Sequence, residues 1–88
     1  MQSADSVPES ILRLTDVPLR EDVELLELRL PAAEAEPLLE RGILPGSILQ
    51  TIRRSPSGDP IVRVDGAVIA LRREAAHGLC VRRLRDAG

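Results

Sequence analysis

Alternating apolar and polar residues predict that most of this chain folds into short strands. In residues 23–30 (VELLELRL) the alternation has a period of two, but its phase changes between Leu25 and Leu26. Such a change is typical of a strand with a bulge, or of a strand buried on both faces. A long helix is the competing interpretation, and Pro31 argues against it because proline directly interrupts the segment. Residues 47–54 (SILQTIRR) have the pattern of a second strand.

Residues 61–71 (IVRVDGAVIAL) contain the strongest local signal. Two runs of β-branched residues flank Asp65 and Gly66, the pair that a two-residue type I′ hairpin turn prefers. Residues 72–77 (RREAAH) are then expected to form one helical turn, and residues 79–84 (LCVRRL) a last strand. Two strands joined by a tight turn are therefore predicted in the second half of the chain.

The best helix candidate is residues 32–41 (AAEAEPLLER). Gly42 follows it at the position where a left-handed C-terminal cap belongs. Proline in a helix interior costs about 3 kcal/mol, so we expect Pro37 in the first turn of a short helix. Leu38 and Leu39 would then both face inward.

These elements add up to about five strands with one or two short helices, the pattern of a small, partly open β-barrel. The remaining connections are a type II turn at Pro45-Gly46 and a loop at 55–60 (SPSGDP). We expect one domain over residues 11–85, a flexible tail over 1–10 and a frayed end over 86–88.

Composition narrows the function. The chain of 88 residues has no Phe, Tyr or Trp, which removes aromatic stacking on bases and the aromatic grooves that bind proline-rich peptides. It has no Walker A loop and no nucleophile beside an oriented base, so we expect no enzyme. A single cysteine, no recognisable signal peptide and no long apolar run predict a cytoplasmic protein that does not insert into a membrane.

Charge is distributed unevenly. The net charge is −2, with ten acids and four arginines in residues 1–44 against four acids and eight arginines in residues 45–88. No overall positive charge favours nucleic acid, so we expect no nucleic-acid partner. All basic side chains are arginines, which either balance the acids on the surface or form a basic contact for an acidic partner.

Four ordered motifs resemble the FeoA family. They are Leu-Thr-Asp at 14–16, Leu-Glu-Arg-Gly-Ile-Leu-Pro-Gly at 39–46, Pro-Ser-Gly-Asp-Pro at 56–60, and the Gly66–Ala76 ending GAVIALRREAA. Three features depart from the family pattern: Pro18-Leu19-Arg20 in place of a Pro-Gly pair, Pro37, and Gly78. The resemblance implies an SH3-like β-barrel.

The resemblance also implies a function: a cytoplasmic accessory protein of bacterial ferrous-iron uptake. Such proteins are thought to act on FeoB, the membrane transporter that carries a GTP-binding domain, so the expected partner is its cytoplasmic region. A similar barrel occurs at the end of iron-dependent repressors, which leaves a metal-sensing regulatory module as the alternative. The 88 residues contain no winged-helix segment, so a complete repressor is not expected.

The sequence contains few metal ligands. His77 and Cys80 are three residues apart and are weak candidates for a divalent ion such as Fe²⁺. Gly78 argues against one helical turn that would carry both. We therefore expect no resident cofactor. The acids near the first predicted strand are another weak group, most simply solvated: Asp16, Glu21, Asp22 and Glu24.

Exposed aliphatic and basic residues are the candidates for a partner surface, because a small barrel cannot bury every leucine. Some of them must be core, and the sequence does not separate the two groups. An exposed remainder would serve for docking or for a weak homo-oligomer. The candidates are Val17, Pro18, Leu19, Leu38, Leu39, Leu44, Arg72 and Arg73.

Overall fold

One antiparallel sheet of six strands forms the body of the molecule. The computed structural model describes residues 11–84, so the predicted tail, the frayed end and Arg85 lie outside the described residues. The strand order is β1-β6-β2-β3-β4-β5. The strands are β1 (Ile11–Arg13), β2 (Asp22–Leu28), β3 (Ile48–Arg54), β4 (Pro60–Val64), β5 (Ala67–Ala70) and β6 (Leu79–Arg83).

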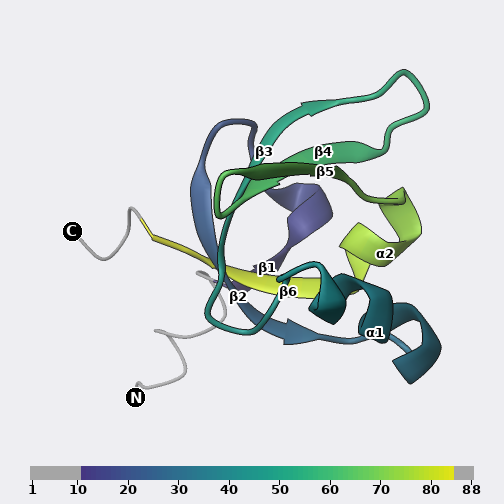
Figure 1. Cartoon of the computed structure of the whole chain (residues 1–88). Helices are drawn as coiled ribbons and strands as arrows, with labels where there is room; N and C mark the ends of the chain where they lie inside the picture. The colour runs from purple at the N-terminus through teal and green to yellow at the C-terminus, as the bar shows by residue number, and fades with distance from the viewer. Residues whose placement is uncertain (1–10, 85–88) are drawn as a thin grey trace, which may run out of the picture.

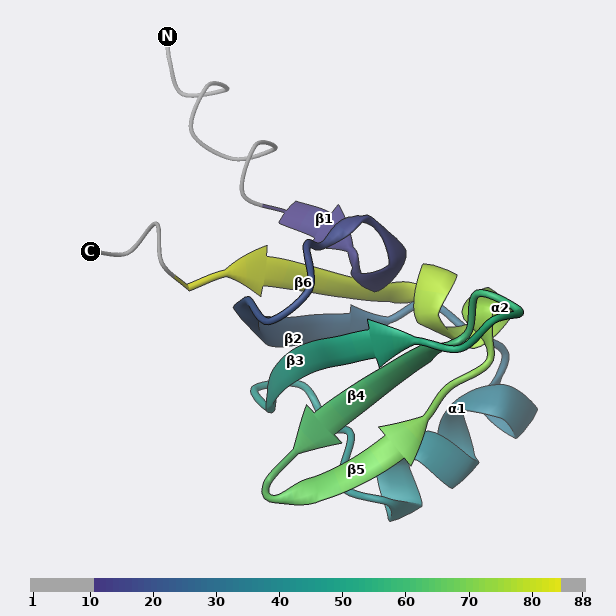
Figure 2. The same cartoon turned by 90° about the horizontal axis from the view of Figure 1, so that it is seen from above.

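The sheet curls into a partly open barrel, as predicted. Figure 2 shows β1 and β5 at opposite ends of the row of strands, and no pairing joins them. Three helical segments complete the fold (Figure 1): the 3₁₀ turn η3 (Leu14–Asp16), α1 (Ala32–Glu40) and α2 (Arg73–His77). The sixth strand is β1, which is only three residues long and therefore too short to show periodicity in the sequence.

The phase change in β2 is a bulge. Leu25 is opposite Val81 and Glu27 is opposite Cys80, which leaves Leu26 as the extra residue. A second irregularity in β3 lies between Thr51 and Arg53. Because a bulge increases local twist and bends its strand, these two irregularities help the sheet to curl.

The β4–β5 hairpin has the predicted turn. Asp65 and Gly66 have φ angles of 50° and 81°, and Val64 pairs with Ala67 across the turn. Positive φ at both central residues is the conformation of a type I′ turn, whose twist matches that of the flanking strands.

An aliphatic core fills the inside of the curled sheet. Its buried side chains come from every strand except β1, from both α-helices, from η3 and from the linking segments. With no aromatic side chain in the chain, this core depends on interdigitated branched side chains. The largest fully buried apolar residues are Leu14, Val17, Val23, Leu25, Ile43, Leu49, Val62, Leu79 and Val81.

Helix α1 corrects two expectations. Pro37 is its sixth residue and not part of its first turn, and Leu39 is 36% exposed while Leu38 is buried. The carbonyl that Pro37 leaves without a helical donor belongs to Ala33, an exposed residue that water can reach. Solvent exposure therefore lowers the cost of an interior proline, which permits the longer helix.

The C-terminal end of α1 has the cap that the sequence predicts. The Ile43 N–H donates to the Leu38 carbonyl and the Gly42 N–H to the Leu39 carbonyl, both at 3.0 Å. With Gly42 at φ 93°, this is a Schellman motif, and its two apolar positions, Leu38 and Ile43, are both buried. The predicted type II turn follows: the Ser47 N–H donates to Leu44 O at 2.8 Å and Gly46 has φ 95°.

Helix α2 is the predicted turn of helix and ends at Gly78. The Asp59 carboxylate accepts a hydrogen bond from the Arg73 N–H at 3.0 Å. This bond connects the loop between β3 and β4 to the start of α2. A Cβ atom on Gly78 would lie 2.5 Å from Leu30 Cδ2 and 2.8 Å from Arg29 O. Gly78 is therefore required by the close approach of the segment that follows β2.

No helix within residues 11–84 has the length and apolarity to cross a bilayer.

Candidate partner-binding groove

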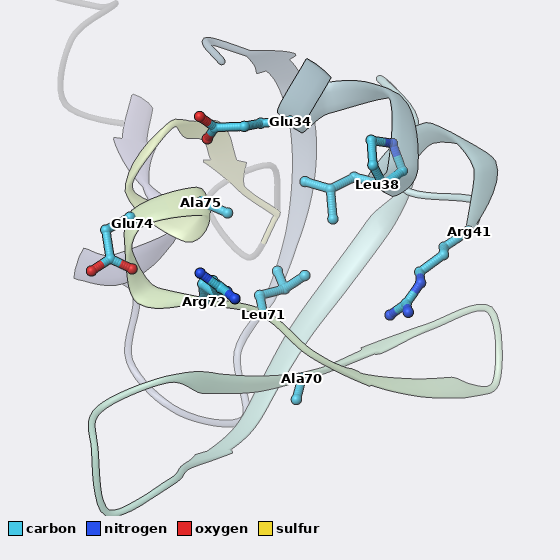
Figure 3. Close-up of a pocket in the computed structure, with 9 residues that line it drawn as sticks. Glu34, Leu38, Arg41, Ala70, Leu71, Arg72, Glu74 and Ala75 are labelled. Carbon is cyan, nitrogen blue, oxygen red and sulfur yellow. The ribbon is translucent and has the colours of Figure 1, made fainter. Parts of the chain in front are cut away.

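A groove separates α1 from the chain that runs from β5 into α2. Its volume is about 570 Å³. Figure 3 shows its lining side chains coming from both sides, with Leu38 entering from α1 and Leu71 from the opposite segment. The lining residues are Glu34, Pro37, Leu38, Arg41, Ala70, Leu71, Arg72, Glu74 and Ala75.

The groove exists because α1 is attached to the body by few side chains. Leu38 is the one buried residue of α1 and Ala35 is half-buried, while the other seven residues of the helix are exposed. Leu38 and Leu71 are 8% and 3% exposed, so they supply an apolar floor. An apolar floor between two partly separated elements is the usual form of a binding site.

Charged side chains surround this floor. Glu34, Glu74, Arg41 and Arg72 are all exposed, and none of them is in an ion pair with another described residue. Figure 3 shows Glu34 and Glu74 toward one end of the groove, Arg72 between Glu74 and Leu71, and Arg41 at the other end. The end with the two acids is therefore net acidic even with Arg72 beside it, and the end with Arg41 is basic.

Comparison with known proteins identifies the family. The family model for the FeoA domain matches residues 12–83, which is most of the chain. The chain belongs to the FeoA family. Among curated proteins no sequence matches it.

Solved structures share the fold. The FeoA protein from Chlorobium tepidum is 26% identical with a TM-score of 0.78, and the match covers 83% of this chain and 70% of that one. The FeoA-like protein from Clostridium acetobutylicum is 21% identical with a TM-score of 0.75, covering 85% and 88%. A manganese-dependent transcriptional repressor is 20% identical with a TM-score of 0.78, covering 93% of this chain and 47% of the repressor. These likenesses confirm the predicted fold class.

The structure divides the predicted partner residues of this FeoA domain. Leu38 and Arg72 line the groove, and Arg73 begins α2 beside it. Val17 is 1% exposed and Leu38 8%, so both are core residues with little surface to offer a partner. The separation of core from surface leucines, which the sequence left open, is made by the fold.

The other apolar candidates lie elsewhere. Leu19 is 43% exposed and lines a second hollow with Leu84, before β2. Pro18 precedes it and is also exposed. Leu39 and Leu44 are 36% and 47% exposed but do not line the groove. Of the eight predicted residues, Leu38 and Arg72 therefore line the groove and Leu19 lines the second hollow.

Two of the four candidate acids near the start of β2 are paired with arginines of β6. Glu24 is paired with Arg82, and Glu21 with Arg83, whose Nη2 donates to Glu21 Oε1 at 3.0 Å. The structure thus favours the interpretation in which these charges balance one another over the one in which they form a basic contact.

His77 and Cys80 belong to different elements. His77 ends α2, where its Nδ1 is 3.3 Å from Thr15 Oγ1, and Cys80 is half-buried in β6. Gly78 ends the helix between them, so the helical spacing that would have placed both side chains on one face is not formed. In residues 11–84 no three His, Cys, Asp or Glu side chains are grouped so that they could hold a metal ion.

Sequence reasoning missed most of the groove. In the sequence, Arg41 is only the last residue of a predicted helix, and Leu71 only the last residue of a predicted hairpin segment. Their common position depends on how far α1 stands from β5, which no local pattern encodes. The only sequence signal is that arginines stand next to these elements: Arg41 directly after α1 and Arg72 directly before α2.

Proposed function

We propose that this protein is a cytoplasmic accessory protein of bacterial ferrous-iron uptake, which binds the cytoplasmic region of the FeoB transporter and modulates its activity or assembly. The match of the FeoA domain model over residues 12–83 carries this proposal, and a solved structure with the same fold is named iron(II) transport protein A. The proposed role is that of a binding module, without catalysis.

The groove supports such a role. The exposed Pro37 and the half-buried Ala75 line it beside the buried Leu38 and Leu71, so a partner finds apolar surface there. The unpaired charges on its rim can fix the orientation of that partner. Arg41 is the most useful probe because it is exposed at the C-terminal end of α1 and has no ion-pair partner among the described residues.

The test uses the full chain and full-length FeoB from the same organism in detergent. We expect binding and a change in GTP turnover with the wild-type chain. Arg41→Glu should weaken binding about tenfold, or about 1.4 kcal/mol. Arg63→Glu is the matched control, because Arg63 is an exposed arginine on β4 that does not line the groove.

Two results are informative in opposite ways. Absence of binding together with unchanged GTP turnover for the wild-type chain would contradict the proposed function. Equal binding by the two charge-reversed variants would leave the function in place but exclude the groove as the contact.

A metal-sensing regulatory module is the second candidate. The fold shared with a manganese-dependent transcriptional repressor favours it. Calorimetry with Fe²⁺ and with Mn²⁺ tests it: heat that disappears in His77→Ala or in a variant with Glu21 and Glu24 neutralised would support it. No heat with either ion would exclude it.

A further inference from the structure

Within residues 11–84, no strand pairs with the outer edge of β5. β5 is the last strand of the sheet and pairs with β4 alone. Just after it, the Leu71 N–H donates to Pro60 O at 2.9 Å, toward β4. Since N–H and C=O groups alternate in direction along an antiparallel strand, those of Ile69 face β4 as well, and those of Val68 and Ala70 face away. No turn, loop or helix of residues 11–84 donates to or accepts from these outward groups.

This edge is short, but it lacks the charged side chains and prolines that usually prevent pairing. β5 has the sequence AVIA, and its exposed residues Ala67, Val68 and Ala70 are all uncharged. The opposite edge, β1, has only three residues and carries Arg13, whose guanidinium donates to His77 O at 3.0 Å. An edge without a charge, a proline or a covering segment is a template for another strand.

The free edge borders the groove. Ala70 is among the groove-lining residues, yet Figure 3 shows its methyl group turned away from the groove and the neighbouring Leu71 side chain turned into it. Ala70 therefore contributes its backbone to the wall. A strand added to β5 would send alternate side chains over Leu38 and Leu71, which joins main-chain hydrogen bonding to an apolar contact.

Resting on the proposed function, we propose that an extended segment of FeoB adds to β5 as a seventh strand. One apolar side chain of the segment lies over Leu38 and Leu71. A basic side chain faces Glu34 and Glu74 at one end of the groove, and an acidic side chain faces Arg41 at the other.

The rim charges favour this occupant over a second copy of the chain. In a pair of copies joined through β5, each would offer the other the uncharged sequence AVIA. Glu34, Glu74 and Arg41 would then receive no opposite charge from the added strand. A segment of mixed charge matches both ends of the groove and also sets the direction of the added strand.

The experiment removes one outward N–H. Ala70→Pro deletes the donor without removing a hydrogen bond to β4, and proline is tolerated at such an edge position. Ala70→Ser is the matched control because it retains the N–H at nearly the same size. Full-length FeoB in detergent is titrated with each full-length variant, and Ala70→Pro is expected to bind about tenfold more weakly than Ala70→Ser. Circular dichroism checks that each variant is folded.

Amide hydrogen exchange of the wild-type chain gives a readout that needs no variant. Binding of FeoB should slow amide exchange at Val68 and Ala70. If Ala70→Pro does not fold, Val68→Pro replaces it in the titration. Binding by both Ala70 variants with equal affinity, without slower exchange at these two amides, would overturn strand addition and leave the proposed function standing.

Two further outcomes separate the alternatives. Failure of the wild-type chain to bind FeoB at all would overturn the proposed function, and this inference with it. In the isolated chain, the exchange rates at Val68 and Ala70 could fall as the protein concentration is raised. That result would show that a second copy occupies the edge and would overturn the proposed occupant.

Discussion

Arginine side chains serve two purposes in this molecule. Arg13 donates to His77 O at the C-terminal end of α2, and Arg54 Nη2 donates to Val17 O at 3.2 Å beyond η3. A planar guanidinium with several donors suits carbonyls that a helix end leaves without partners. Arg41 and Arg72 stabilise no such group in the described chain. This contrast separates arginines that hold the fold from arginines available to a partner.

Thr51 is the one buried polar side chain of the described core. It is 1% exposed, and its hydroxyl has no hydrogen-bond partner among residues 11–84. A buried donor without a partner costs about 1–3 kcal/mol, because it loses its hydrogen bonds to water. The hydroxyl therefore lowers the stability of the fold.

Thr51→Val should raise the free energy of unfolding by about 1 kcal/mol, since it replaces the unpaired hydroxyl with a methyl of similar volume. Urea unfolding followed by circular dichroism measures the change. Thr51→Ser is the control: it retains the hydroxyl and removes a methyl, which should lower stability by about 1 kcal/mol. A Val variant less stable than the wild type would show that the hydroxyl has a partner.

Helix α1 depends more on its C-terminal cap than on side-chain packing. Its interior includes Pro37 and only Leu38 is buried, so few packing contacts support it. The Schellman motif at its C-terminal end satisfies the Leu38 and Leu39 carbonyls and brings Ile43 into the core. The position of α1, and with it the width of the groove, therefore depends on Gly42.

Gly42→Ala should lower the free energy of unfolding by about 1–2 kcal/mol, because an L-residue with a Cβ resists positive φ. The space around this glycine is open, with no atom within 4 Å of an added Cβ, so the cost is in the backbone. Gly42→Asn should cost less, since asparagine tolerates this region better. Equal losses for Ala and Asn in thermal unfolding would contradict the backbone explanation.

The molecule as a whole brings its two oppositely charged halves together. The acids of β2 are opposite the arginines of β6, although Glu24 and Arg82 are 58 residues apart in the sequence. The side chains of the Glu24–Arg82 and Glu21–Arg83 pairs are 13–41% exposed, so solvent still screens them and each pair stabilises the fold by about 1 kcal/mol or less. Their main effect is to neutralise charge where β2 and β6 lie side by side.

A single core shared by both α-helices and by every strand except β1 predicts a single cooperative unfolding transition. Cys80, the only cysteine, is half-buried in β6 between β1 and β2, and its reaction with a thiol reagent reports locally on that part of the sheet. The urea midpoint measured from Cys80 reactivity should coincide with the midpoint from circular dichroism. Two separate midpoints would show that β1 or α1 unfolds independently.

Local patterns in the sequence determined most of the elements. The β4–β5 turn, the bulge in β2, the cap at Gly42 and the end of α2 at Gly78 each depend on residues within a few positions of one another. Such features follow from backbone sterics and side-chain periodicity, which act over short range. Even so, the place of Pro37 was predicted wrongly, because the cost of an interior proline depends on solvent around Ala33.

Tertiary structure alone decided which residues could meet a partner. Val17 and Leu38 are aliphatic residues in the same sequence segments as Leu19 and Leu39. The first two are nevertheless buried, and the last two are exposed. The groove joins residues of α1 to residues about thirty positions later, across a gap whose width is set by packing at Leu38. The free edge of β5 likewise exists only because the curled sheet stops before β1 reaches it. Sequence patterns specify which backbone groups a strand offers, but only the closure of the barrel determines which of them stay unpaired.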